Sequence, residues 1–128
     1  MEISPVLEKL DPKLADALKA RNLESFLPAQ AKAIEAGLLD INKNLLICTP
    51  TASGKTLIAE IAAMESIYRE VGTAVYISPL KALASEKYQE FKERYKDIRF
   101  ALSIGDVDVK NSFMERADFI LTTSEKMD

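Results

Sequence analysis

The first part of the chain places leucines at helical spacing with polar residues between them, which is typical of amphipathic helices. These leucines are Leu7, Leu10, Leu14 and Leu18. The pair Asp11-Pro12 interrupts the pattern. Aspartate is a good N-cap, and proline fits the first position of a helix. We therefore expect two short helices in residues 1–22 rather than one long helix.

A third short helix is expected in the segment PAQAKAIEAG, which begins at Pro28. Its apolar positions recur at helical spacing. Gly37 can end this helix, because glycine readily adopts the left-handed backbone conformation that closes many helices.

Further along, short apolar runs alternate with amphipathic segments. The runs predicted as strands are NLLICT (44–49), TAVYISP (73–79), IRFALSIG (98–105) and DFILTT (118–123). The segments predicted as helices are 57–71 and 79–95, the second with an apolar face of Leu80, Leu83, Ala84, Tyr88, Phe91 and Tyr95. NLLICT is continuously apolar, as in a strand covered on both faces. This alternation predicts an α/β fold, a parallel sheet with flanking helices on both faces.

The composition narrows the class of protein. Hydrophobic residues make up 48% and charged residues 29% of the chain, as in a compact globular protein. The net charge of -3 excludes a global basic field that would attract nucleic acid. One cysteine, Cys48, and no histidine exclude an internal disulfide framework and a zinc cluster. We expect a cytoplasmic protein, with no secretory signal after Met1 and no apolar run of membrane-spanning length.

The segment CTPTASGKTLIAE (48–60) carries the clearest chemistry. The phosphate-loop pattern is G-x-x-x-x-G-K-[ST], and Gly54, Lys55 and Thr56 match its end, while Thr49 stands where the first glycine would be. A loop between a strand and a helix can surround a polyphosphate with backbone N–H groups. Lys55 would act on the β- and γ-phosphates, and Thr56 would give its hydroxyl to Mg²⁺. The alternative is an ordinary helix start.

The segment PTASGKTLIAEIA, with FLPAQAKAI before it and PLKALASEKYQEF after it, resembles the Ski-like helicases of superfamily two, in particular the archaeal Hjm-type DNA-repair helicases. The resemblance runs from about residue 23 to the end of the chain. It implies that residues 23–128 are the first part of a RecA-like ATP-binding domain, preceded by a helical segment at 1–22. Phosphate loops of this group commonly lack the first glycine, so the resemblance accommodates Thr49 and Ala52.

The resemblance also implies specific cofactors and nucleotide-binding residues. The cofactors are ATP and Mg²⁺, with Lys55 as the catalytic residue and Thr56 as the metal ligand. Gln30 matches the glutamine that recognises adenine, because an amide can accept from adenine N6 and donate to N7 at once. The residues implied in nucleotide binding are Gln30, Thr51, Ala52, Ser53, Gly54, Lys55 and Thr56. A surface glutamine on an amphipathic helix is the alternative for Gln30.

Three segments at predicted strand ends resemble the nucleic-acid motifs of these helicases. The residues that the resemblance implies are Ser78, Pro79, Leu80, Lys81, Gly105, Asp106, Thr122, Thr123 and Ser124. Open α/β sheets bind ligands at the carboxyl ends of their strands, and helix N-termini attract phosphate. Contacts of this kind are made to the backbone of the nucleic acid and not to its bases. The implied partner is therefore single-stranded or forked DNA, bound with strong salt dependence. Ordinary turns, caps and solvated lysines are the alternative explanation.

One part of the catalytic machinery is missing from the sequence. ATP hydrolysis in the resembled family needs an Asp-Glu pair to hold Mg²⁺ and align water, and the 128 residues contain no Asp-Glu dipeptide. We therefore expect an N-terminal fragment of a helicase that binds nucleotide weakly and is inactive alone. Missing neighbouring strands would leave apolar sheet edges open, so self-association or an altered phosphate loop is also expected.

Other functions remain open at this point. A phosphate-loop kinase would need a cluster of substrate-binding acids or arginines, whereas the arginines here are scattered. A binding module without a nucleotide role is a second alternative, which titration with labelled ATP and Mg²⁺ would distinguish. RNA could replace DNA as the partner, because backbone contacts do not separate the two without a test of the 2′-OH.

Overall fold

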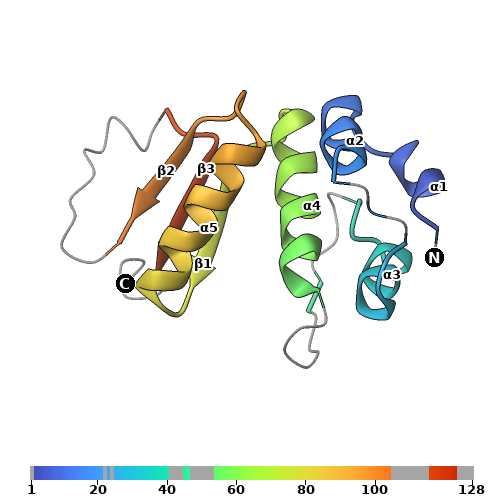
Figure 1. The fold of residues 1–128 in the computed structure, drawn as a ribbon, viewed down its shortest axis with the longest axis horizontal. Helices are drawn as coiled ribbons and strands as arrows, with labels where there is room; N and C mark the ends of the chain where they lie inside the picture. Colours follow the sequence, from blue (N-terminus) through green and yellow to red (C-terminus); the bar gives the residue numbers. More distant parts are fainter. Residues whose placement is uncertain are drawn as a thin grey trace. The chain divides into compact units, whose positions relative to one another are not determined.

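The computed structural model describes residues 2–21, 23, 25–40, 45–46, 54–104 and 116–123. The chain divides into two compact units, Met1–Glu70 and Val71–Asp128. Helices form the described part of the first unit, and the second contains a sheet and a helix (Figure 1). In the part of the chain that the structure describes, no helix has both the length and the apolar character needed to cross a membrane.

The first unit begins with α1 (Ser4–Leu7) and α2 (Pro12–Lys19). As predicted, Asp11 is the N-cap of α2: its carboxylate accepts a hydrogen bond of 3.0 Å from the backbone N–H of Lys13, and Pro12 occupies the first helical position. The chain therefore forms two helices where the leucine pattern alone would allow one.

Helix α3 (Pro28–Glu35) ends as its sequence predicts. Gly37 has a positive φ of 106°. The N–H groups of Gly37 and Leu38 bond back to the carbonyls of Ile34 and Ala33, which is the hydrogen-bond pattern of a Schellman motif. This closure separates α3 from the segment that leads to the next helix.

Helix α4 (Lys55–Tyr68) packs against α2 and α3 (Figure 1). It buries Leu57, Ile58, Ile61 and Met64. The opposing core residues from the N-terminal helices and the segment before α3 include Val6, Leu10, Leu14, Leu18, Phe26 and Ala33. The first unit is thus a helical cluster around the helix that begins at Lys55.

Two buried glutamates on α4 tie the N-terminal helices to it. Glu60, only 1% exposed, forms an ion pair with Arg21 at 3.0 Å. Glu65 accepts a hydrogen bond of 2.8 Å from the backbone N–H of Asp11 and pairs with Arg69 at 2.9 Å. Because a buried carboxylate without a partner is left with an uncompensated charge, these contacts help to fix α2 and its flanking residues to α4.

The second unit contains β1 (Ala74–Ser78), α5 (Lys81–Arg94), β2 (Phe100–Ser103) and β3 (Phe119–Thr123). The strands form a parallel sheet in the order β1-β3-β2. The three predicted strands in residues 73–123 and the helix between the first two are confirmed, with ends that differ by at most two residues.

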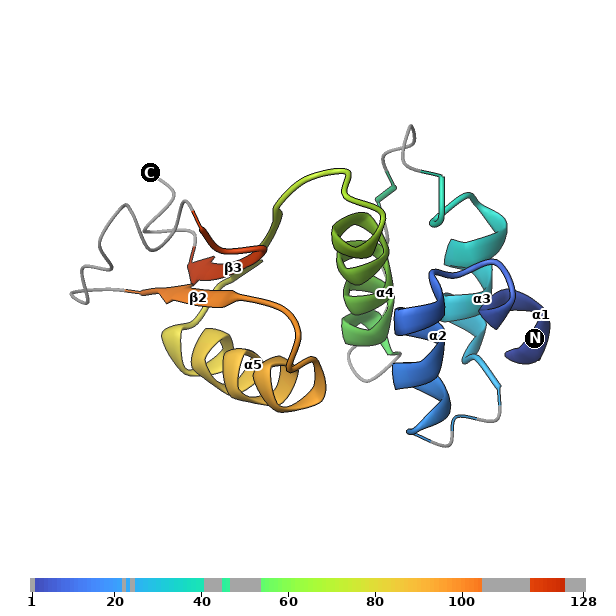
Figure 2. The same cartoon turned by 90° about the horizontal axis from the view of Figure 1, so that it is seen from above.

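Helix α5 covers one face of this sheet (Figure 2). Phe91 is fully buried, with its ring centroid 6.0 Å from that of Tyr76 and 5.6 Å from that of Phe119. Side chains alternate between the faces of a strand, so Val75 and Ile77 lie on the opposite face of β1, where they are 49% and 52% exposed.

Two expectations about apolar residues are wrong. Leu80 and Leu83 were expected on the buried face of the helix, but they are 59% and 39% exposed. Leu80 precedes the first turn in an extended conformation, and Leu83 lies a third of a turn from the buried Ala84. For the predicted strand 44–49, only Leu45 and Leu46 are described. Neither belongs to a strand, and they are 37% and 91% exposed, which is not a strand covered on both faces.

Candidate nucleotide and nucleic-acid site

Gly54 gives the start of α4 a conformation that few other residues could adopt. It is the N-cap, with φ 84° and ψ 24° in the left-handed region, which glycine enters without steric cost. Lys55 and Thr56 follow as the first two helical residues, the first exposed and the second half-buried. The first N–H groups of a helix have no acceptor within the helix, so a helix start can attract anions.

The side chain of Gln30 lies directly against this glycine. Its Oε1 accepts a hydrogen bond of 2.8 Å from the backbone N–H of Leu27, and its Nε2 donates one of 3.2 Å to the carbonyl of Gly54. Gln30 is 5% exposed, so the alternative of a surface glutamine is wrong. The amide retains one acceptor site and one N–H, because each of its atoms can make two hydrogen bonds.

A side chain at position 54 would collide with this amide. A Cβ built on Gly54 would overlap Gln30 Nε2 and would lie 3.0 Å from both Gln30 Cδ and Leu27 Cδ1. The glycine is therefore needed for the approach of Gln30 as well as for its backbone angles. The structure brings together two of the residues that the sequence assigned to the nucleotide. Thr51, Ala52 and Ser53 lie outside the described residues.

The proposed cofactors place different demands on these residues. A polyphosphate fits the donor set, because backbone N–H groups and Lys55 would all face negative charge. For Mg²⁺ the sequence offers the hydroxyl of Thr56. No group of three or more histidine, cysteine or acidic side chains that could hold a metal occurs in the described ranges. Carboxylates and phosphate oxygens are the usual further ligands of this ion.

The second unit collects hydroxyl groups at the carboxyl ends of its strands. Ser78 of β1 is in register with Thr123 of β3, and Ser103 of β2 with Thr122 of β3. All four are at most 3% exposed. Thr122 Oγ1 donates a hydrogen bond of 2.7 Å to the carbonyl of Ser103, whereas Ser103 Oγ and Thr123 Oγ1 have no hydrogen-bond partner within the described residues.

Three of the sequence-predicted nucleic-acid residues therefore meet at one sheet edge: Ser78, Thr122 and Thr123. Pro79, Leu80 and Lys81 follow Ser78, are all exposed, and lead into α5. Buried hydroxyls without partners are uncommon in folded proteins, so this edge has polar groups to offer a ligand. Gly105, Asp106 and Ser124 lie outside the described residues.

Sequence reasoning missed Ser103 at this edge. The segment SIGD was assigned through Gly105 and Asp106, although Ser103 is the last residue of β2 and is hydrogen-bonded through its carbonyl to Thr122. The sequence did contain a signal for Ser103. It is a hydroxyl residue near the carboxyl end of a predicted strand, as Ser78 and Thr122 are.

Comparisons with known proteins give the family of the chain. The model of the DEAD/DEAH box helicase family matches residues 27–128. The chain is 46% identical over 117 residues to "ATP-dependent DNA helicase Hel308" of Pyrococcus abyssi, covering 91% of this chain and 16% of that protein. It is 49% identical over 113 residues to the protein of that name from Methanococcus vannielii, covering 83% and 15%. It thus spans about a sixth of the length of these relatives.

Solved structures agree with this assignment. The crystal structure of the DUF1998 helicase MrfA matches with a TM-score of 0.75 and 27% identity over 91% of this chain and 19% of that chain. A hypothetical ATP-dependent RNA helicase from Sulfolobus tokodaii matches with a TM-score of 0.71 over 92% of this chain and 35% of that chain, at 20% identity, which shows the fold alone. The described sheet and helices are accordingly those of a RecA-like domain. The chain belongs to the DEAD/DEAH box helicase family.

Proposed function

We propose that this chain is the ATP-binding and DNA-contacting part of an ATP-dependent DNA helicase. The observation that carries the proposal is the contact of Gln30 with left-handed Gly54 directly before Lys55 and Thr56. It joins the residue expected to recognise adenine to the loop expected to hold phosphates. Relatives named ATP-dependent DNA helicases support the same activity.

In this proposal each residue has a separate task. Backbone N–H groups of residues 51–56 surround the phosphates, and Lys55 neutralises the γ-phosphate. Thr56 would hold Mg²⁺ through its hydroxyl, and the ion would supply positive charge to the phosphates. Gln30 uses its remaining donor and acceptor on the adenine edge. Residues 23–128 form the first part of the RecA-like domain, and residues 1–22 are a helical segment whose helix α2 packs on α4.

Binding of a fluorescent ATP analogue with Mg²⁺ tests this assignment. Lys55→Ala should weaken binding about tenfold or more, because a charge-assisted contact to phosphate is worth about 1.5–3 kcal/mol. Lys19→Ala is the matched control, since Lys19 is an exposed lysine of the same unit at the far end of α2. No turnover is expected from these 128 residues, because they contain no Asp-Glu pair. Equal binding by both variants would reject the nucleotide site.

We further propose that the strand-end hydroxyls and Lys81 contact single-stranded or forked DNA. The buried hydroxyls of Ser103 and Thr123, which have no partner among the described residues, support this. The structure of MrfA that is described as bound to DNA supports it as well, with a match at 26% identity. Oligothymidylate should bind with an affinity that falls steeply with salt. Lys81→Ala should reduce the salt slope by about one. Preference for oligouridylate would instead favour RNA. Because the proposed partner is the DNA of the cell, we also propose that the protein is cytoplasmic.

Self-association of the 128-residue chain is proposed from the same unit. Within the described sheet β1 is an edge strand, and its apolar Val75 and Ile77 are about half exposed. Unpaired edges with apolar side chains readily pair with a second chain. Size-exclusion chromatography with light scattering would show a dimer or a larger species, and a monomer at all concentrations would reject this proposal.

A further inference from the structure

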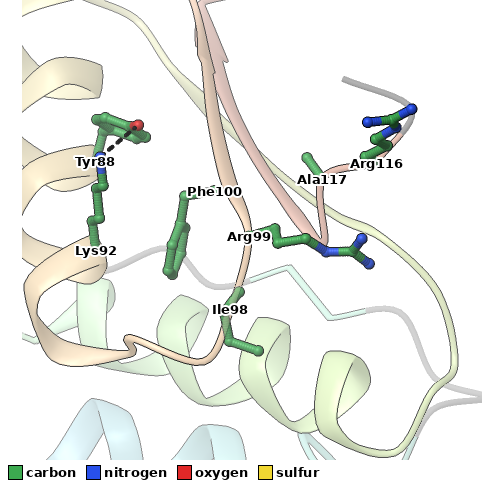
Figure 3. A pocket seen from close by; sticks show the side chains of 7 residues that line it. All are labelled: Tyr88, Lys92, Ile98, Arg99, Phe100, Arg116 and Ala117. Carbon is green, nitrogen blue, oxygen red and sulfur yellow. Dashed lines mark hydrogen bonds between the residues drawn. The ribbon is translucent and has the colours of Figure 1, made fainter. Parts of the chain in front are cut away.

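A cavity of about 510 Å³ lies at the amino ends of β2 and β3 (Figure 3). The lining residues are Tyr88 and Lys92 of α5, Ile98, Arg99 and Phe100 around the start of β2, and Arg116 and Ala117 before β3. Parallel strands have all their amino ends at one edge, so this cavity lies at the opposite end of the sheet from Ser78, Thr122 and Thr123. None of the residues assigned to nucleotide or DNA lines it.

The floor of the cavity is apolar and well packed. Phe100 is 6% exposed, and its ring centroid lies 5.3 Å from that of Phe119 in the core. Ala117 is 6% exposed, and Ile98 is half-buried. Figure 3 shows the Phe100 ring between the side chain of Lys92 and that of Arg99. The volume is within the range of about 300–1,000 Å³ that is usual for ligand sites.

The rim of the cavity is cationic. Three of the seven lining residues are lysine or arginine, and none is acidic, although the whole chain has a net charge of -3. Lys92 Nζ lies 5.3 Å from the centroid of the Tyr88 ring and donates a hydrogen bond of 3.4 Å to its hydroxyl. Arg116 is exposed. Local positive charge on an acidic protein selects anionic ligands.

Neighbouring contacts hold the third cation in place. Arg99 Nη2 lies 3.1 Å from Asp118 Oδ1, and Arg99 Nε donates to Asp118 Oδ2 at 3.3 Å. The backbone N–H of Arg99 also donates to Asp118 Oδ2 at 3.0 Å. Because Asp118 neutralises much of the charge of Arg99, Lys92 and Arg116 supply most of the attraction for an anion.

We propose that this cavity binds an acidic peptide segment of a partner protein through one apolar anchor side chain. The anchor would lie on Phe100, Ile98 and Ala117, and flanking carboxylates would meet Lys92 and Arg116. A nucleic acid fits less well, because base stacking needs an open aromatic face. Lys92 lies over the ring of Tyr88, which leaves no free platform there. Phe100 packs against Phe119 and is only 6% exposed, so it can contact one anchor side chain but presents no open face to a stacked base.

Fluorescence anisotropy on the 128-residue chain tests the proposal. The probe is a labelled decapeptide of aspartates with one central phenylalanine, and saturable binding is expected. Replacing both Lys92 and Arg116 with glutamate should weaken binding at least about tenfold, since attraction becomes repulsion at two positions. Lys96→Glu is the matched control, an exposed lysine of the same unit that does not line the cavity. It should change affinity less than about twofold.

Several outcomes would overturn the proposal. Absence of saturable binding would do so, and so would equal weakening by Lys96→Glu, which would indicate diffuse attraction by charge. Displacement of the probe by oligothymidylate would assign the cavity to nucleic acid. If a probe with alanine in place of its phenylalanine bound with equal affinity, the cavity would not bind an apolar anchor side chain. Unchanged far-UV circular dichroism of the double variant would exclude misfolding, which is not expected because both positions are exposed.

Discussion

Replacing Gly54 with alanine should destabilise the helical unit by an amount that the structure defines. At φ 84° the backbone of residue 54 is left-handed, which costs an alanine about 1 kcal/mol. The added Cβ would force Gln30 to move its amide away from two backbone hydrogen bonds. Leaving such buried groups unpaired costs about 1–3 kcal/mol. The expected loss in free energy of unfolding is therefore about 2–4 kcal/mol.

Urea unfolding followed by far-UV circular dichroism measures this loss, and the chain offers a matched control. A Cβ on Gly72 would meet no atom within 4 Å, and Gly72 is not among the described glycines with positive φ. Gly72→Ala should therefore leave stability unchanged or raise it by up to about 1 kcal/mol, because alanine restricts the unfolded chain.

A second substitution separates the two contributions to the loss. Gln30→Ala removes the amide atoms that the new Cβ would strike. In the double variant only the backbone strain and the lost amide bonds remain. The lost amide bonds are counted in both single variants but only once in the double variant. The sum of the two single losses in free energy of unfolding should therefore exceed the loss of the double variant. The reasoning would be refuted if Gly54→Ala unfolded at the same urea concentration as Gly72→Ala, or if the losses at Gly54 and Gln30 were additive.

Three further predictions concern the sheet unit. Phe91→Ala should lower the free energy of unfolding by about 3–5 kcal/mol in urea denaturation, because it removes a fully buried ring. Hydrogen bonds from Arg99 lower the pKa of Asp118 below its ordinary 3.8, outweighing partial burial. The stabilisation lost in Asp118→Asn should therefore be present at neutral pH and vanish as pH falls below that value, as urea midpoints would show. Lysine at both Val75 and Ile77 should shift light scattering towards monomer, because edge charges prevent pairing.

Each of these predictions has an outcome that contradicts it. Leu83→Ala is the control for the buried ring, and an equal loss from this exposed residue would mean that burial on α5 has been assigned incorrectly. A difference between Asp118→Asn and the parent chain that persisted unchanged in acid could not come from the ionised carboxylate. If the lysine variant associated as strongly as the parent chain, the edge of β1 would not be the interface.

The spacing of apolar residues predicted the helix Lys81–Arg94 but not which of its residues are buried. Ala84, Phe91 and Tyr95 are buried, as expected of one stripe. Leu83 belongs to the neighbouring stripe, which the single sheet face does not reach, and Leu80 precedes the helix. Periodicity reports how a helix could present apolar groups. How many of these apolar groups are buried depends on how much of the helix the sheet covers. That is a property of tertiary packing and cannot be predicted from local spacing.

The apolar run at 44–49 shows a related limit. Its composition indicates side chains that favour burial, yet Leu46 is 91% exposed. A strand inside a parallel sheet needs hydrogen-bonded neighbours on both edges and covering groups on both faces. These neighbours come from other parts of a fold. The apolar run therefore predicts that the segment favours burial, but not that it forms a strand. By contrast, the caps at Asp11 and Gly37 depend on adjacent residues alone, and both were predicted correctly.

Gln30 illustrates why the candidate site could be located from the sequence while its geometry could not. The resemblance selected this glutamine for adenine, and the pattern Gly54-Lys55-Thr56 selected the loop, but their contact spans 24 positions in the chain. In the structure the amide already serves the start of α3 and the carbonyl before α4. A nucleotide using its remaining donor and acceptor would therefore act on a group that also fixes the loop. Substitutions at Gln30 should then change stability and nucleotide preference together.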